Sequence, residues 1–235
     1  MPAQTRIIHY YVCLGAAGGK EWKVNMTILE IDNVSYRYKN TRENILADVN
    51  QTFESGQFYA IIGASGAGKS TLLSLLARLD EPQEGHILFE QEDIKQKGYS
   101  YHRRHHISLV FQNYNLIDYL TPLENVRLAD KKASSSILIE LGLNPNQIKR
   151  NVMKLSGGQQ QRVAIARALA SKAPVILADE PTGNLDENTA DEIITILKKM
   201  AKERNKCVIV VTHSKQLAQS ADVVLELKDK KLQIV

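Results

Sequence analysis

Apolar and polar residues follow two different patterns along this chain of 235 residues. Between Ile28 and Gln57 they mostly alternate, with a turn near Lys39–Asn44, and this period of two predicts an antiparallel β-subdomain. Farther along, short apolar runs predict strands, and residues at helical spacing follow several of them. The predicted strands are Phe58–Ile62, His86–Phe89, Ile107–Phe111, Val175–Ala178, Cys207–Val211, Val223–Leu227 and Lys231–Val235. The length of the chain suits one α/β domain with a small subdomain.

The junction between the first of these strands and the helix after it carries a glycine-rich loop. Its residues are Gly63, Ala64, Ser65, Gly66, Ala67, Gly68, Lys69, Ser70 and Thr71, which fit G-x-x-x-x-G-K-[ST] at every defined position. A strand before and a helix after this pattern are the context of a phosphate-binding loop, whose backbone N–H groups and helix start attract an anion. Lys69 is expected to reach the outer phosphates, and the Ser70 hydroxyl is expected to bind Mg²⁺. The alternative interpretation is a glycine-rich turn with a chance lysine, which would not need a strand before it and a helix after it.

Polar residues also mark the ends of three later strands, at the edge where open α/β sheets bind ligands. Gln112 follows the third predicted strand, Asp179 and Glu180 follow the fourth, and His213 follows the fifth. Adjacent carboxylates after a phosphate-binding loop predict one acid that supports Mg²⁺ and one base that acts on water. A lone histidine is usually structural, but a third polar position at this edge favours a function for His213.

Two further stretches have both an ordinary and a functional interpretation. In the run Leu155–Arg162 (LSGGQQQR), Ser156 is a good N-cap, and Gly157 and Gly158 allow a close backbone approach. The run is either a plain capped helix or a second helix start that binds an anion. Tyr38 lies at the turn end of the predicted β-subdomain, where it is either a half-exposed strand tyrosine or a platform for an adenine ring.

Composition and charge narrow the class of protein. The formal charge of +4 does not indicate a nucleic-acid partner, because proteins that bind nucleic acids usually carry a concentrated basic face. Cys13 and Cys207 form no disulfide framework, which favours a reducing compartment. No uncharged apolar stretch is long enough to span a bilayer, so a function at a membrane would require another chain. His102, His105 and His106 have a spacing that suits a metal, but without nearby Cys or carboxylate partners we expect a solvated helix face.

Residues 1–25 differ in character from the rest of the chain. The segment Ile7 to Gly19 is apolar and small behind Arg6, which resembles a weak secretory signal, although the motifs downstream require a cytosolic nucleotide. Alternatively the segment is not native, because a clean strand pattern opens at Met26. We expect residues 1–25 to be a non-native or disordered extension, with Met26 as the working start and residues 26–235 as the ATP-binding domain.

In this order, the motifs resemble those of the ATP-binding cassette (ABC) family from Met26 to the end of the chain. The motifs that carry the resemblance are a Walker A loop at Gly63–Thr71, a Q-loop glutamine at Gln112, an LSGGQ signature at Leu155–Gln159, a Walker B strand at Ile176–Asp179 with the catalytic Glu180, a D-loop at Leu185-Asp186, a switch histidine at His213 and an A-loop aromatic residue at Tyr38.

Within the family, the chain is similar to the cluster that holds MacB-, LolD-, FtsE- and bacitracin-exporter-type ATPases, and within it most similar to Vex-type exporters. The run Pro181–Asp186 carries this similarity, together with Val110–Gln112 and Leu120–Val126. The segment between Gln112 and Ser156 is shorter than this cluster leads us to expect, which bears on how the signature helices dock and not on the chemistry.

The resemblance implies an α/β fold, namely a P-loop NTPase core with an antiparallel β-subdomain and an inserted helical subdomain. It also implies that two copies sandwich two ATP molecules head to tail, so that Walker A of one copy faces the signature of the other. Three residues would be catalytic: Glu180 polarises water, His213 steadies the γ-phosphate and Gln112 senses it. The metal ligands it implies are Ser70, Gln112 and Asp179, and the nucleotide-binding residues outside Walker A are Tyr38, Ser156, Gly157, Gly158, Gln159 and Asp186.

A partner in the membrane is also implied. The chain would be an ATPase subunit at the cytoplasmic face of the membrane and would drive a separate FtsX- or MacB-like permease, which exports a peptide, lipoprotein or antimicrobial compound. A short permease helix is expected to dock near Tyr114, Leu116 and Tyr119, unless these are local core. One alternative is an FtsE-like ATPase that signals mechanically without transport. Another is a soluble DNA- or ribosome-associated ATPase, which usually has a coiled-coil insertion or two tandem cassettes, and neither is visible here.

Overall fold

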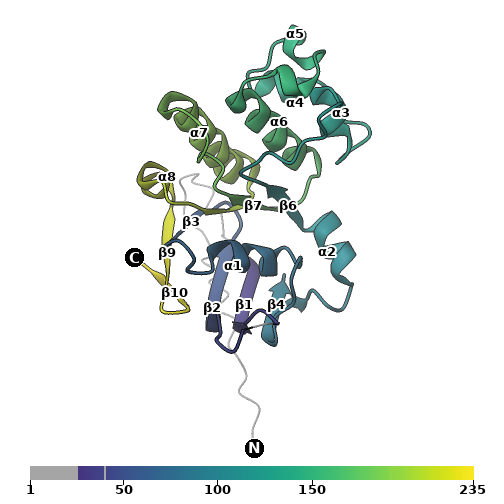
Figure 1. Ribbon diagram of the computed structural model, residues 1–235. Helices are drawn as coiled ribbons and strands as arrows, with labels where there is room; N and C mark the ends of the chain where they lie inside the picture. Colours follow the sequence, from purple (N-terminus) through teal and green to yellow (C-terminus); the bar gives the residue numbers. More distant parts are fainter. Residues whose placement is uncertain (1–25, 40) are drawn as a thin grey trace, which may run out of the picture.

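The computed structural model describes residues 26–39 and 41–235, so the prediction for residues 1–25 lies outside the described residues (Figure 1). Its strands are β1 (Thr27–Tyr36), β2 (Leu46–Glu54), β3 (Phe58–Ile62), β4 (Glu84–Phe89), β5 (Glu92–Asp93), β6 (Ile107–Val110), β7 (Val175–Asp179), β8 (Cys207–Val211), β9 (Val223–Lys228) and β10 (Lys231–Ile234). Its α-helices are α1 (Lys69–Leu76), α2 (Tyr99–His105), α3 (Pro122–Arg127), α4 (Ser136–Glu140), α5 (Pro145–Ile148), α6 (Gly157–Ala170), α7 (Glu187–Arg204) and α8 (Lys215–Ser220).

A six-stranded sheet with the order β10-β9-β3-β8-β7-β6 forms the centre of the molecule. β3 pairs in parallel with β8 and β9, β7 pairs in parallel with β6 and β8, and β10 is antiparallel to β9. Every residue of β8 is buried, which explains why the sequence of this strand is a continuous apolar run. The carboxyl ends of the parallel strands meet at one edge of the sheet, and the polar residues that follow them therefore lie close together.

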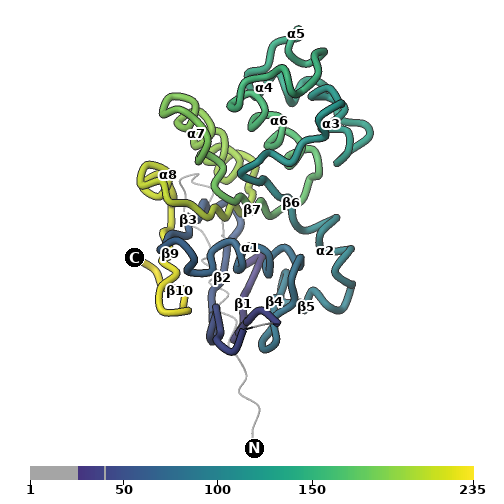
Figure 2. Tube along the Cα trace, in the orientation of Figure 1, coloured from purple at the N-terminus to yellow at the C-terminus, as the bar shows by residue number. Residues whose placement is uncertain are grey.

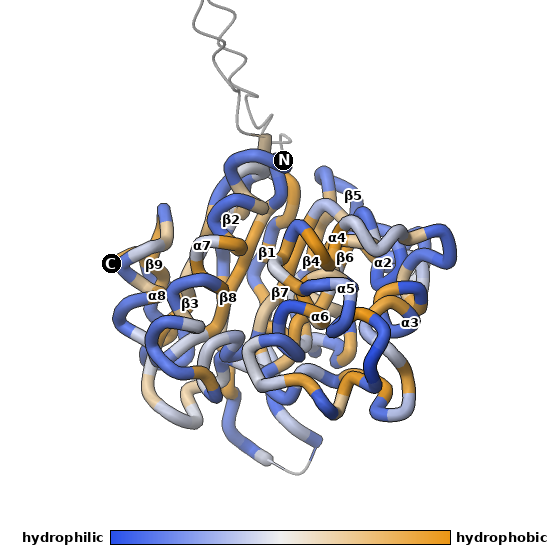
Figure 3. The backbone as a smooth tube through the Cα atoms, turned by 90° about the horizontal axis from the view of Figure 1, so that it is seen from above, coloured by the Kyte–Doolittle hydropathy of each residue, from blue (hydrophilic) through white to orange (hydrophobic). Residues whose placement is uncertain are grey.

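The central sheet separates two hydrophobic cores. Tyr59 and Ile61 of β3 belong to the core shared with α1 and the antiparallel sheet, whereas Phe58 and Ala60 belong to the core shared with α6, α7 and α8. This alternation is the period of two of a strand that is covered on both faces. The antiparallel sheet has the order β2-β1-β4-β5. In Figure 3 hydrophobic residues concentrate on the central strands, and hydrophilic residues dominate the outer turns.

The helices between β6 and β7 form a group of their own, set apart from the two sheets (Figure 2). Capping boxes open two of its short helices, Thr121 with Glu124 at α3 and Asn144 with Gln147 at α5. Their apolar residues pack with α6 into the second of the two cores. The predicted α/β fold with an antiparallel subdomain and an inserted helical group is confirmed. Within the described residues, every helix is too short or too polar to serve as a membrane span.

The prediction of a solvated histidine face on α2 is wrong for His102, which is only 1% exposed. Its Nε2 lies 3.0 Å from the carbonyl oxygen of Leu76 on α1, and its Nδ1 lies 3.1 Å from Nδ1 of His106. His106 in turn stacks on Phe89, with ring centroids 3.7 Å apart. Burial lowers the pKa of His102 to about 4. No group of three or more His, Cys, Asp or Glu that could hold a metal occurs among the described residues.

Candidate active site

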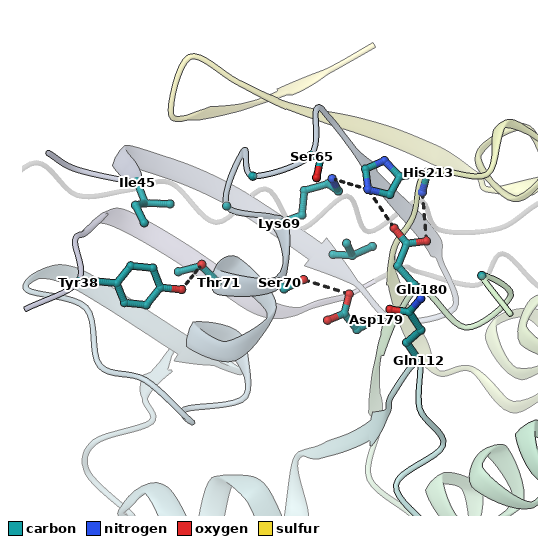
Figure 4. A pocket seen from close by; sticks show the side chains of 14 residues that line it. Tyr38, Ile45, Ser65, Lys69, Ser70, Thr71, Gln112, Asp179, Glu180 and His213 are labelled. Atoms are coloured by element: carbon teal, nitrogen blue, oxygen red, sulfur yellow. Dashed lines mark hydrogen bonds and ion pairs between the residues drawn. The ribbon is translucent and has the colours of Figure 1, made fainter. Parts of the chain in front are cut away.

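A cavity of about 670 Å³ opens where the β-subdomain, the glycine-rich loop and the carboxyl edge of the central sheet meet (Figure 4). Most of the predicted site residues line it. They are Tyr38, Ser65, Gly66, Gly68, Lys69, Ser70, Thr71, Gln112, Asp179, Glu180 and His213. The fold thus gathers around one cavity residues from both ends of the described chain.

The backbone explains two of the glycines in the loop between β3 and α1. Gly68, the N-cap of α1, has φ 102°, and a Cβ there would lie 2.5 Å from Cγ2 of Ile45. Gly63 has φ 151°, and a Cβ there would lie 2.5 Å from the carbonyl oxygen of Leu227. A side chain at Gly68 would push the loop away from Ile45, and one at Gly63 would push it away from β9, so the path of the loop depends on glycine.

The side chain of Lys69 is directed into this loop and is only 6% exposed. Its ammonium group donates hydrogen bonds to the carbonyl oxygens of Gly63, at 2.9 Å, and Ala64, at 3.0 Å, and lies 3.2 Å from Nε2 of His213. Burial lowers the pKa of Lys69, and the two carboxylates at the sheet edge partly offset that shift. A buried positive charge therefore lies at the floor of the cavity, next to the backbone that would surround a phosphate.

Ser70, in the first turn of α1, faces Asp179 at the end of β7. The Ser70 hydroxyl donates a hydrogen bond of 3.2 Å to Oδ1 of Asp179. A hydroxyl and one carboxylate are too few ligands for an all-protein metal site. Mg²⁺ is commonly bound by one or two carboxylates and the phosphates of a nucleotide, and it keeps several waters. The donor set of Ser70 and Asp179 fits that kind of site.

Glu180 is held apart from Asp179 although the two are adjacent in sequence. It has φ 46°, a left-handed conformation that is uncommon for a residue other than glycine and is typical of strained functional positions. One carboxylate oxygen, Oε2, accepts from the Thr212 hydroxyl at 3.3 Å and from the His213 backbone N–H at 3.2 Å. The other oxygen, Oε1, is buried, lies 3.4 Å from Nε2 of His213 and has no hydrogen-bond donor among the described residues.

Sequence reasoning did not select Thr212, which is fully buried at the end of β8. Besides donating to Glu180, its hydroxyl accepts a hydrogen bond of 3.0 Å from the Ser214 backbone N–H. Thr212 therefore fixes the carboxylate and the turn that carries His213. The rule that selected Gln112, a polar residue at the carboxyl end of a buried strand, would have selected it too.

Gln112 and Tyr38 enter the cavity from opposite sides (Figure 4). The Gln112 amide lies beside Gly183, where an added Cβ would be 3.2 Å from Gln112 Nε2. The Tyr38 hydroxyl lies 2.7 Å from the hydroxyl of Thr71 on α1, while 44% of Tyr38 stays exposed. The Tyr38 ring is thus anchored at one end and open to a ligand on its face, as stacking with a base requires.

The signature and D-loop residues lie outside this cavity and form a second unit. Ser156 caps α6 with Gln159 in a capping box, and Asp186 caps α7 by accepting from the Thr189 backbone N–H at 3.0 Å. A Cβ at Gly158 would lie 2.3 Å from Cγ2 of Thr189, so the first turn of α6 packs directly on the first turn of α7. Within one chain, none of these residues lines the cavity beside the glycine-rich loop.

Comparison with known proteins places these motifs in a family. Residues 46–183 match the family model described as ABC transporter. YclH, an uncharacterized ABC transporter ATP-binding protein of Bacillus subtilis, is 42% identical over 212 residues, which are 86% of this chain and 94% of that protein. The lipoprotein-releasing system ATP-binding protein LolD of Rickettsia felis is 40% identical over 223 residues, 90% of this chain and all of that protein. The macrolide export ATP-binding/permease protein MacB of Pasteurella multocida is 38% identical, but this chain covers 34% of its length.

Solved structures agree with the sequence relatives. The dimeric structure of the ABC transporter cassette MJ0796, a protein of Methanocaldococcus jannaschii, superposes with a TM-score of 0.78 at 38% identity and covers 88% of this chain and 97% of its own. A dimeric post-hydrolysis state of the same cassette, bound to ADP and phosphate, gives a TM-score of 0.76. LolD and MacB are two of the types that the sequence motifs predicted, whereas the narrower similarity to Vex-type exporters stays a prediction.

Proposed function

The chain belongs to the ABC transporter family of ATPases, and from that premise we propose that two copies of it hydrolyse ATP at shared sites and drive a membrane permease. One observation carries the proposal. The cavity at the sheet edge holds the groups for phosphate, metal and water, while the signature unit around Ser156 and Asp186 lies elsewhere on the same chain. A second copy, placed head to tail, would bring its signature unit to this cavity.

The residues of the cavity would have different roles in binding ATP and Mg²⁺. The Lys69 ammonium and the loop N–H groups would bind the phosphates, and the Tyr38 ring would stack on the adenine. Ser70 and Asp179 would hold Mg²⁺, which neutralises phosphate charge when bound. Gln112 would complete the metal ligands, although its amide lies beside Gly183 in the isolated chain.

Glu180 is the group we expect to accept a proton from the attacking water. Its Oε2 is fixed by Thr212 and by the backbone of His213, and its Oε1 is a buried acceptor with no donor among the described residues. An oxygen of that kind is ready to accept from a water in the cavity. The His213 ring lies between this carboxylate and Lys69, and from there it would contact the terminal phosphate.

A groove of about 660 Å³, lined by residues of α2, β6 and α6, offers a place for the permease. Of the residues that the structure describes, three arginines line it, Arg103 and Arg104 of α2 and Arg167 of α6, and no acidic residue does. Its apolar side chains include Phe111 and Leu128. We place here a short permease helix that carries apolar residues and at least one carboxylate, because a carboxylate would pair with the guanidinium groups.

This position differs from the docking residues expected from the sequence. Tyr114 and Leu116 are half-buried, and Leu116 packs against the core of the helical group. Tyr119 is 81% exposed but does not line the groove. The segment after Gln112 therefore borders the docking surface through other residues, such as Asn115.

The names of the relatives suggest the class of cargo. LolD is named for lipoprotein release and MacB for macrolide export, so we propose that the permease exports a lipoprotein, peptide or antimicrobial compound. The ATPase would then lie at the cytoplasmic face of the membrane. Reconstitution with the partner permease tests this point: ATP-dependent release of a cargo from the membrane supports export, and ATP-driven conformational change without any release supports mechanical signalling.

Mixed dimers test the shared site. One copy carries Lys69→Ala and the other Ser156→Arg, both in a Glu180→Gln background that retains nucleotide. In a head-to-tail dimer one site combines both defects, and the other is intact and retains one ATP per dimer. Each variant alone should retain none. If the signature acted on the loop of its own chain, the mixture would retain none either, which would overturn the shared-site arrangement.

A further inference from the structure

We propose that Arg167 is a positioning residue that links the groove to the signature motif through Tyr114; this inference rests on the proposed shared site and docking groove. Arg167 lies on α6, the helix that begins with the signature, and lines the groove. Its guanidinium donates from Nη1 to the carbonyl oxygen of Asn115 and, at 3.0 Å, from Nη2 to that of Tyr114. One rigid fork therefore holds two consecutive peptide groups.

The segment held by Arg167 has a conformation that needs such support. Tyr114 has φ 58° and Asn115 has φ 48°, so two successive residues other than glycine adopt the left-handed conformation. Two local backbone hydrogen bonds also hold the bend, from the Tyr114 N–H to the Phe111 carbonyl, at 3.1 Å, and from the Asn115 N–H to the Asn113 carbonyl. Without the guanidinium, the carbonyl groups of this bend would lose the only side-chain donors that hold them within the described residues.

The same segment is attached to the helical group on its other side. The Asn125 side chain, fully buried on α3, accepts from the Ile117 N–H at 2.7 Å and donates to the Ile117 carbonyl at 3.2 Å. Residues 114–117 are thus bonded to α6 and α3, while Gln112 lies at the sheet edge, where its carbonyl accepts from Asn184 at 3.4 Å. A relative movement of the two parts would have its hinge between Gln112 and Tyr114.

The Tyr114 side chain reaches from this bend to the signature. A Cβ at Gly157 would lie 2.9 Å from the Tyr114 hydroxyl, so the ring packs against the backbone of the signature where a side chain is missing. Leu185 contacts the same glycine from the D-loop side, with Cδ2 3.7 Å from that Cβ position. Arg167 sets the orientation of Tyr114 through the backbone. That orientation therefore determines how the Tyr114 side chain packs against Gly157 in the first turn of α6.

The groove gives a partner direct access to this link. Burial lowers the pKa of Arg167, and its guanidinium bonds two carbonyl oxygens but no carboxylate within the described residues. A carboxylate of a docked permease helix would pair with the same guanidinium that holds Tyr114 and Asn115. Docking would thereby alter the packing of Tyr114 against the signature turn. The affinity of one copy for the other would then change although the permease helix makes no contact with ATP.

The test separates Arg167 from an arginine outside the groove. Arg167→Lys keeps the charge but loses the fork, and Arg127→Lys is the matched control, because Arg127 on α3 also bonds a carbonyl, that of Ala133, but does not line the groove. In the Glu180→Gln background we measure binding of Mg-ATP to the monomer and ATP-dependent dimerisation by analytical ultracentrifugation. Arg167→Lys should weaken dimerisation about tenfold, within the usual range of coupling between sites, with monomer ATP affinity unchanged. Arg127→Lys should change neither.

A second variant covers the case in which Arg167→Lys does not fold. Tyr114→Leu removes the ring that rests on Gly157 and should weaken dimerisation in the same way, and the two changes combined should cost little more than one of them. Equal dimerisation of Arg167→Lys, Tyr114→Leu and the parent protein would overturn the link while leaving the shared site intact. Failure of the parent Glu180→Gln protein to dimerise with ATP would instead overturn the shared site, and the link with it.

Discussion

The carboxyl edge of the central sheet and the helical group between β6 and β7 hold their functional residues by different means. At the sheet edge, Asp179 ends β7 and Thr212 directly follows β8. Both strands are covered on both faces, so ladders of hydrogen bonds fix the backbone of these two residues. In the helical group, short helices are opened by capping boxes, and the connecting segment is held by single side chains such as Asn125 and Arg167.

The difference matches what each region has to do. Phosphate chemistry needs groups placed within a fraction of an ångström, and a continuous sheet supplies that rigidity. In the function we propose, the helical group carries a signal between a permease and the second copy, and contacts made by a few side chains would let it shift between two arrangements. In this proposal the reacting groups are part of the sheet, and the groups that respond to a partner are part of the helices.

Glu180→Gln should produce the largest effect and tests the sheet edge. Loss of a general base typically lowers the rate by about 10²–10⁴-fold, and phosphate release should fall by that factor while Mg-ATP still binds. Asp179→Asn should instead weaken Mg-dependent nucleotide binding, because Asp179 pairs with Ser70 and not with the groups around Glu180. Glu203→Gln, an exposed acid on α7, is the control. Near-normal turnover of Glu180→Gln would show that another group takes the proton.

Gly158→Ala tests the contact between the signature and the first turn of α7. The new Cβ would overlap Cγ2 of Thr189, and overpacking of this kind should weaken ATP-dependent dimerisation by about tenfold or more. Thr189→Ser removes that methyl group but keeps the hydroxyl that donates to Asp186. Combining the two changes should restore most of the dimerisation, measured by gel filtration with Mg-ATP. A double variant as weak as Gly158→Ala would argue against the steric cause.

Asn125→Ala tests whether single side chains hold the helical group. The change leaves the Ile117 N–H without a partner, whereas the Ile117 carbonyl loses the Asn125 donor and keeps the Leu120 N–H, at a cost of about 2–3 kcal/mol in the free energy of unfolding. Asn144→Ala removes only a helix cap and should cost about 1 kcal/mol. Urea unfolding compares the two. Equal losses would mean that the segment after Gln112 does not depend on Asn125.

The smallest effect concerns pH and the buried His102. Its pKa of about 4 lies below the 6.5 of an unfolded histidine, so the unfolded chain binds the proton more tightly. Stability should therefore fall as pH falls through this window, by at most about 2 kcal/mol between pH 7 and pH 5. His102→Gln should flatten that part of the pH profile, and His105→Gln, an exposed neighbour, should not. An unchanged profile in His102→Gln would assign the pH dependence to other groups.

The sequence by itself determined the strands, the glycine-rich loop and the polar residues at the strand ends. These features are local: the burial of a strand shows in its apolar run, and the loop needs its glycines in one contiguous segment. From that alone Lys69, Asp179, Glu180 and His213 could be assigned to one edge, and the structure brings them to one cavity. Their roles in hydrolysis stay predictions.

Only the tertiary structure decided which distant side chains meet. The pairing of Tyr38 with Thr71, the burial of His102 against α1, and the path from Arg167 through Tyr114 to Gly157 join residues from separate elements. A short helix such as α2 has no periodicity strong enough to show which face is covered, and a hydrogen bond from a side chain to a distant carbonyl leaves no pattern in the sequence. Such contacts depend on how the elements pack, and packing is fixed by the complementary shapes of whole surfaces.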